Sequence, residues 1–157
     1  IAAAKALNGT GKVYAIDVQK DLLTRLESSC REQHLSNVGF VWANLEEAGG
    51  AKLADQSVDI AIVSNVLFQA ENKKILLDEV KRVLRQGGTL LLIDWSGACK
   101  SMGPAKGQVF PEIEARKMVE AMNFTFDHNI DAGNFHYGIV FKKGLYRGPA
   151  NVGPVTR

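Results

Sequence analysis

Apolar residues along this chain follow two patterns that alternate: short continuous runs, and spacings of three or four residues. The first pattern predicts strands and the second predicts helices. Four short apolar runs, at residues 12–17, 38–44, 58–65 and 88–94, predict strands. Apolar residues three or four positions apart predict helices over 19–34 and 111–122, and a third that starts at Glu71 and is capped by Gly87 or Gly88. A short helical stretch is expected over 46–54. This alternation of strands and helices favours an α/β fold, with a mostly parallel sheet covered by helices on both faces.

The pattern changes near the carboxyl end of the chain. Residues 124–130 and 135–143 alternate apolar and polar positions, and only the turn-forming sequence "DAGN" separates them. A connection this short joins antiparallel strands. The sequence therefore predicts one domain over residues 1–143 that ends in an antiparallel hairpin, followed by an irregular tail over 144–157 that is rich in glycine and proline.

Composition and charge narrow the classes of protein that fit. The chain has 157 residues, a formal net charge of +2 and no long basic segment, which gives no reason to expect a nucleic-acid partner. No apolar run approaches the roughly 20 residues that cross a bilayer, so no membrane span is expected. Cys30 and Cys99 are too far apart in sequence to form a metal-binding motif, so no metal site is predicted. The low number of cysteines favours a reducing compartment, and a cytoplasmic location is therefore expected. The opening "IAAAKALNG" is typical of the last turns of a helix, which suggests that an upstream segment is missing.

A polar residue ends each of the four predicted strands: Asp17, Asn44, Asn65 and Asp94. Open parallel sheets bind ligands beyond the carboxyl ends of their strands, so these side chains outline a candidate binding edge. A carboxylate at the position of Asp17 commonly accepts hydrogen bonds from both hydroxyls of an adenosine ribose. The alternative, that each residue caps a loop or a helix, stays open at this point.

Three segments carry a resemblance to a known family: "GKVYAIDVQKDLL", "VDIAIVSNVLFQAENKKILLDEVKRVLRQGGTLLLIDW" and "HYGIVFKK". They resemble class I S-adenosylmethionine-dependent methyltransferases, of the small-molecule type similar to the quinone-biosynthesis enzymes. The resemblance implies a Rossmann-like sheet with a terminal antiparallel hairpin. It also implies that the cofactor S-adenosylmethionine is bound by Asp17, Val18, Asn44, Leu45, Asn65 and Val66. Phe68, Asp94 and Trp95 are then the candidates on the side of a small-molecule substrate.

The main difference from the family lies at the start of the chain. The family's first strand and glycine-rich loop would precede Ile1, so both are missing from this sequence. Methyl transfer from an activated sulfonium needs mainly alignment and exclusion of water, and no catalytic residue is predicted. Asp94 fits a capping or positioning role better than that of a general base. His128 and His136 lie on predicted strands and fit packing roles, and Cys99 is expected to be unreactive.

Two other functions remain open from the sequence. An NAD-binding Rossmann oxidoreductase would account for Asp17 and the sheet, but it would not account for the terminal hairpin. A non-catalytic remnant of a methyltransferase would account for the missing first strand.

Overall fold

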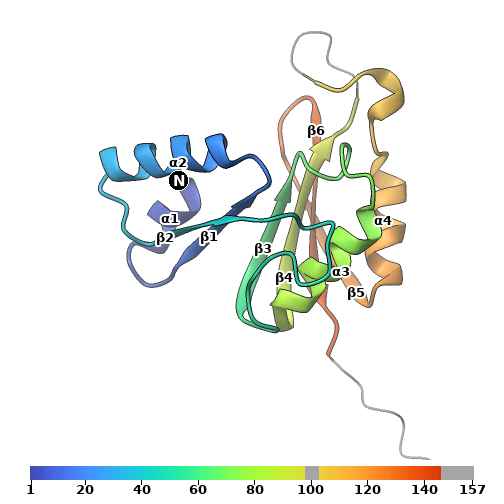
Figure 1. The fold of residues 1–157 in the computed structure, drawn as a ribbon. Helices are drawn as coiled ribbons and strands as arrows, with labels where there is room; N and C mark the ends of the chain where they lie inside the picture. The colour runs from blue at the N-terminus through green and yellow to red at the C-terminus, as the bar shows by residue number, and fades with distance from the viewer. Residues whose placement is uncertain (98–102, 146–157) are drawn as a thin grey trace, which may run out of the picture.

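The computed structural model describes residues 1–97 and 103–145 (Figure 1). Cys99 and nearly all of the predicted tail therefore lie outside the described residues. The elements in chain order are α1 (Ala2–Leu7), β1 (Val13–Asp17), α2 (Lys20–Glu32), β2 (Val38–Trp42), β3 (Val58–Ser64), α3 (Lys73–Val83), β4 (Leu84–Trp95), the short 3-10 helix η1 (Lys106–Gln108), α4 (Glu112–Ala121), β5 (Phe124–Ile130) and β6 (His136–Lys143). Among the described residues, no helix has both the length and the apolar content that crossing a membrane requires.

The strands form two sheets. β1 and β2 pair in parallel, and the second sheet has the order β3-β4-β6-β5. In the second sheet β3 and β4 are parallel, whereas β6 is antiparallel to both β4 and β5. The predicted α/β class and the terminal hairpin are thus confirmed.

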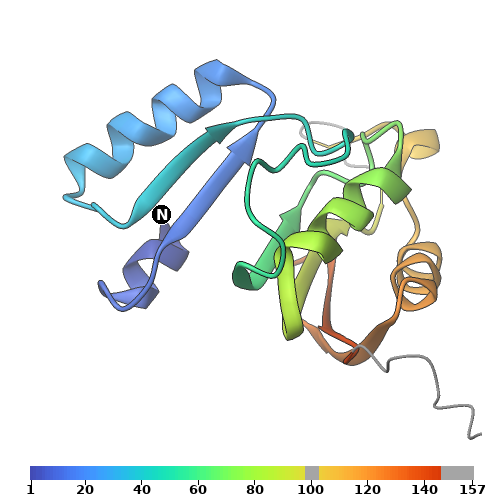
Figure 2. The same cartoon turned by 60° about the horizontal axis from the view of Figure 1, so that its bottom comes forward.

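One edge of each parallel pair has no partner. Within the described residues β1 pairs only with β2, and β3 pairs only with β4. Figures 1 and 2 show β1 as the strand of its sheet on the side that faces β3. Unpaired backbone groups therefore line both sides of the division between the sheets. A strand placed in this division would pair with both edges.

The packing of the four-stranded sheet differs between its two faces. Leu90 and Leu92 of β4 are fully buried in one cluster with α3 and α4, which includes Leu76 and Val119. Side chains alternate between the faces of a strand, so residues of β3 with the opposite orientation point away from this cluster. Ile60 and Ile62 of β3 are 60% and 54% exposed, respectively. In the described residues the second face of β3 is thus largely uncovered.

Two predicted helix details are wrong. Residues 46–54 form turns rather than a short helix, and the backbone N–H groups of Gly49 and Ala51 bond to a side chain of α3, as described below. The glycines predicted to cap the third helix lie inside β4, which starts immediately after α3. The pairing of β4 with β3 shifts between Leu84 and Thr89, and Gly87 in this irregular stretch has a φ of 70°. Glycine is favoured at this position because it adopts a left-handed backbone without the steric cost of a side chain.

Candidate functional site

Two open clefts lie next to the carboxyl ends of β1 and β2. The first, of about 510 Å³, is lined by Val18, Asn44, Glu46, Gln69, Glu71 and Asn72. The second, of about 460 Å³, is lined by Val18, Trp42, Ala43, Asn44, Glu47, Ala48, Gly49, Gly50 and Lys52. Val18 and Asn44, both predicted cofactor residues, line both clefts. The carboxyl ends of the strands are therefore the hollowed edge of this part of the molecule.

Asp17 is the last residue of β1 and lies beside these clefts, next to Val18. Its Oδ1 accepts a hydrogen bond of 2.7 Å from the backbone N–H of Gln19. No described group donates to the other carboxylate oxygen, which remains available to a ligand. Val18 is 56% exposed, and its backbone carbonyl accepts a hydrogen bond from Nε1 of Trp42. The capping role and the ribose-binding role of Asp17 are therefore compatible, one for each oxygen.

Asn44 is more constrained than the sequence suggests. Its Oδ1 accepts from the backbone N–H of Glu46 at 3.0 Å, and its Nδ2 donates to Glu47 at 3.1 Å. One lone pair of Oδ1 and one N–H of Nδ2 are left for a ligand. Leu45 is half-buried against the core cluster, and within the described residues its backbone N–H has no partner.

A second group of predicted residues surrounds the end of β3. Asn65 has a left-handed backbone, with φ of 55°, and donates its N–H to the carbonyl of Ile93. Its Oδ1 is buried and has no hydrogen-bond partner among the described residues. Val66, half-buried, accepts backbone hydrogen bonds from Gln69 and Ala70, which closes the turn that leads away from the strand.

Asp94 is fully buried near the end of β4 and is hydrogen-bonded to that turn. Its Oδ2 accepts from the N–H of Phe68 at 3.0 Å, and its Oδ1 accepts from the N–H of Trp95 at 2.8 Å. Burial raises the pKa of the Asp94 carboxyl, although these hydrogen bonds act in the opposite direction. With both oxygens already bonded to backbone groups, Asp94 holds the Phe68 turn in place.

The structure brings the predicted residues together in two groups. Asp17, Val18 and Asn44 lie at the clefts, whereas Asn65, Phe68, Asp94 and Trp95 lie at the ends of β3 and β4. The pattern of strand ends did not single out Glu46, Glu71 and Trp42, which also line the clefts. Trp42 had a visible signal, since it lies at the end of an apolar run. The two glutamates lie in loops, where no periodicity identifies a ligand-facing residue. Among the described residues, no cluster of side chains could hold a metal ion.

Known proteins share both the sequence pattern and the fold. An arsenite methyltransferase from Halobacterium salinarum is 29% identical over 92 residues, which cover 59% of this chain and 23% of that protein. A demethylmenaquinone methyltransferase from a Geobacillus species is 28% identical over 96 residues, which cover 61% of this chain and 40% of that protein. The matches thus span less than half the length of these curated relatives. The crystal structure of a SAM-dependent methyltransferase from Aquifex aeolicus superposes with a TM-score of 0.80 at 24% identity, covering 90% of this chain and 74% of that one.

The match to a family model extends over the whole predicted domain. Residues 1–143 match the family described as a methyltransferase domain. This range includes both parallel strand pairs, the two groups of site residues and the terminal hairpin. The chain belongs to this methyltransferase-domain family.

Proposed function

We propose that this chain is the core of an enzyme that transfers a methyl group from S-adenosylmethionine to a small-molecule acceptor by in-line displacement. The observation that carries the proposal is the open carboxyl edge of β1 and β2, where the free oxygen of Asp17 and the exposed Val18 adjoin the clefts. Membership of the methyltransferase-domain family supports the same function. A cytoplasmic location remains a prediction from the sequence.

The residues present fit the parts of this cofactor. The unpaired carboxylate oxygen of Asp17 suits the hydroxyls of a ribose, because a charged acceptor forms strong hydrogen bonds with such donors. Val18 offers an apolar surface to the adenine ring. The buried, unpartnered Oδ1 of Asn65 suits a donor such as the ammonium of the methionine part, with Val66 beside it. The backbone N–H of Leu45 and the second lone pair of Asn44 Oδ1 are available to the polar edge of the adenine.

The sulfonium of the bound cofactor supplies an already activated methyl group, so the protein has to align the acceptor and exclude water. Phe68, Asp94 and Trp95 are the proposed acceptor-side residues. Asp94 acts through its two backbone hydrogen bonds, which set the path of the Phe68 turn. By their names, the two relatives act on arsenite and on demethylmenaquinone.

A complete cofactor site needs a further strand. The unpaired edges of β1 and β3 fit one strand that runs parallel to both, and such a strand would bring a glycine-rich loop to the same edge of the sheet. We therefore expect tight cofactor binding from a longer form of the chain that carries this segment.

Ligand-induced stabilisation tests the proposal. In a thermal-shift titration of the longer form, S-adenosylhomocysteine at a hundredfold excess over its dissociation constant should stabilise the fold by about 2.7 kcal/mol. NAD, the matched nucleotide control, should give no shift. Stabilisation by NAD alone would exclude the methyltransferase assignment in favour of an oxidoreductase.

The variant Asp17→Asn sharpens this test. It keeps an acceptor for Gln19 and replaces only the oxygen proposed for the ribose. We expect weaker S-adenosylhomocysteine binding with little loss of stability. Asp21→Asn, in the first turn of α2, is the exposed control and should bind normally. Equal affinity of the two variants would remove Asp17 from the site.

A further inference from the structure

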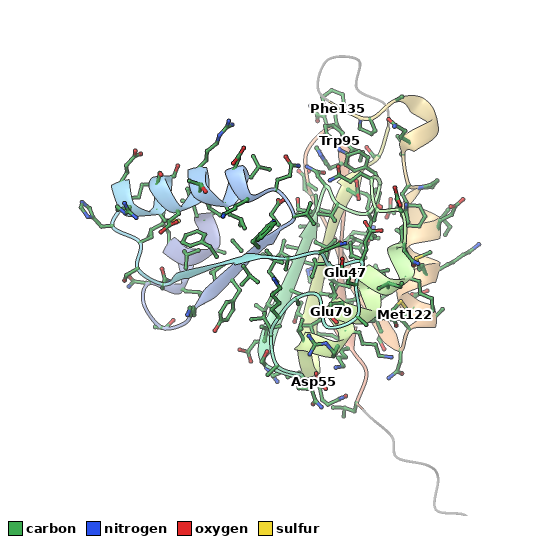
Figure 3. The ribbon with its side chains drawn as sticks, viewed as in Figure 1. Glu47, Asp55, Glu79, Trp95, Met122 and Phe135 are labelled. Carbon is green, nitrogen blue, oxygen red and sulfur yellow. The ribbon has the colours of Figure 1, made fainter. Side chains whose placement is uncertain are left out.

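A histidine that the sequence places in the terminal hairpin lies at the acceptor side of the site. His136 begins β6 and pairs directly with Trp95, the last residue of β4. Because β6 runs antiparallel to β4, its first residues lie at the edge where β4 ends. The two rings are in contact, with centroids 4.2 Å apart and planes inclined by 35°. Figure 3 shows Trp95 at this end of the four-stranded sheet together with Phe135, which is 50% exposed.

The ring of His136 has an unfilled hydrogen-bonding position. Its Nε2 is buried and has no partner among the described residues, and the only other such buried side-chain atom found there is Oδ1 of Asn65. β4 lies between β3, which ends one residue before Asn65, and β6, which begins at His136, so the two residues lie on opposite sides of the end of β4. An unpaired buried polar group costs about 1–3 kcal/mol, which makes a bound partner favourable at each position.

The neighbouring ionisable groups are less suited to exchange a proton with a ligand. Both carboxylate oxygens of Asp94 accept backbone N–H groups, as described above. The hydroxyl of Tyr137 donates to the carbonyl of Phe110, and burial is the main cause that raises its pKa, with smaller contributions from Asp94 and Glu112 of α4. The imidazole of His136 is the one group of this set without a hydrogen bond from its side chain.

We propose that His136 contacts the methyl acceptor and takes the proton of its nucleophilic group. The proposal rests on the function proposed above and names a residue for it. The acceptor is then a protic nucleophile, such as an aromatic hydroxyl or a thiol. Its lone pair forms the new bond to the methyl carbon while the carbon–sulfur bond breaks, and that electron pair stays on sulfur as a neutral thioether. The proton of the acceptor moves to Nε2, and the positive charge passes from the sulfonium to an imidazolium beside Asp94.

Nuclear magnetic resonance tests the contact directly. The chain has three histidines, so three ring Hε1 resonances are expected, and His136→Gln identifies one of them. His34 and His128 are exposed and serve as internal controls. Hydroquinone and benzyl mercaptan, each added to the longer form saturated with S-adenosylhomocysteine, are the two probes. At least one should shift the His136 resonance and leave both controls in place. Absence of a His136 shift with both probes would overturn the proposal.

Kinetics then separates proton transfer from packing. With the probe that shifts His136, His136→Gln should lower kcat by about a hundredfold or more, the usual size of a general-base contribution. S-adenosylhomocysteine affinity should be unchanged, and the fall of the rate at acid pH should disappear. His128→Gln is the matched control on β5 and should behave as the unsubstituted protein. An unchanged kcat in His136→Gln would refute the role. If the unsubstituted protein does not bind S-adenosylhomocysteine, the proposed function itself is refuted.

Discussion

Glu79 joins the loop after β2 to α3, and replacing it tests how that loop is held. Its side chain is 3% exposed. The carboxylate accepts hydrogen bonds from the backbone N–H groups of Gly49 at 3.1 Å and Ala51 at 2.8 Å. Arg82, one turn further along α3, donates to both of its oxygens, at 2.8 and 2.7 Å. Gly49 lines one of the clefts, so this carboxylate fixes part of the proposed cofactor site.

The size of the effect follows from the pKa of Glu79. Its hydrogen bonds with Arg82 are the largest cause that lowers this pKa from 4.5 to about 2, while burial opposes the change and the two loop N–H groups contribute to it. Each pKa unit corresponds to 1.36 kcal/mol, so the ionised form stabilises the fold by about 3 kcal/mol. A carboxyl whose pKa is lowered in the folded state contributes this stability above its unfolded pKa. The contribution is lost as the pH falls from about 5 to about 2.

Urea denaturation of Glu79→Gln checks this value. At neutral pH the variant should lose about 3 kcal/mol of unfolding free energy, and it should lack the part of the acid destabilisation that Glu79 supplies. Asp78→Asn, the adjacent residue of α3, removes an exposed ion pair with Lys74 and should cost less than about 1 kcal/mol. A loss in Glu79→Gln no larger than in Asp78→Asn, or an unchanged acid profile, would refute the assigned role.

Two further predictions concern the loop and the buried carboxyl. In Gly50→Ala the new Cβ would lie 1.8 Å from the carbonyl oxygen of Asn44, so the loop must move, and we expect a loss of about 1–3 kcal/mol in urea denaturation. Gly97→Ala meets nothing within 4 Å and should be neutral; equal losses would show that the close approach is not a constraint. Burial raises the pKa of Asp94 above its ordinary 3.8, so its ionisation opposes folding increasingly as the pH rises past that value. The stability of Asp94→Asn relative to the unsubstituted protein should therefore increase from acid to neutral pH, and a pH-independent difference would contradict the effect of burial.

The sequence predicts an element correctly where the spacing of apolar residues and the turn residues within that element are sufficient to define it. The hairpin of β5 and β6 was visible because its apolar residues alternate and a four-residue turn limits the topology. The end of α3 was misjudged because Gly87 and Gly88 are equally typical of a helix cap and of a bulge. Which of the two occurs depends on the pairing of β4 with β3, and local sequence does not contain that information.

Some residues of the candidate site could likewise be predicted from local sequence, and others could not. Polar residues at strand ends, such as Asp17 and Asn65, were identified because parallel strands end at a common edge. Their individual contacts remain proposals, as does the ligand. Glu79 and His136 were not identified as site residues. Glu79 acts on a loop that is 28 residues earlier in the chain, and His136 reaches Trp95 only through the antiparallel pairing of β6. Contacts of this kind depend on tertiary structure.

Ile60 and Ile62 connect the sequence pattern with the division of the sheet. Residues 58–65 form a nearly continuous apolar run, the pattern of a strand covered on both faces, yet these two side chains are 60% and 54% exposed. Complete burial of an isoleucine side chain stabilises a fold by about 1.5–3 kcal/mol. Because Ile60 and Ile62 are about half exposed, the fold lacks roughly 2–3 kcal/mol of this stabilisation for the two together. The unpaired edge of the same strand forgoes a ladder of backbone hydrogen bonds as well. A strand placed between β1 and β3 would pair that edge. The same addition would supply the loop that the proposed cofactor site requires, so stability and cofactor binding should be gained together.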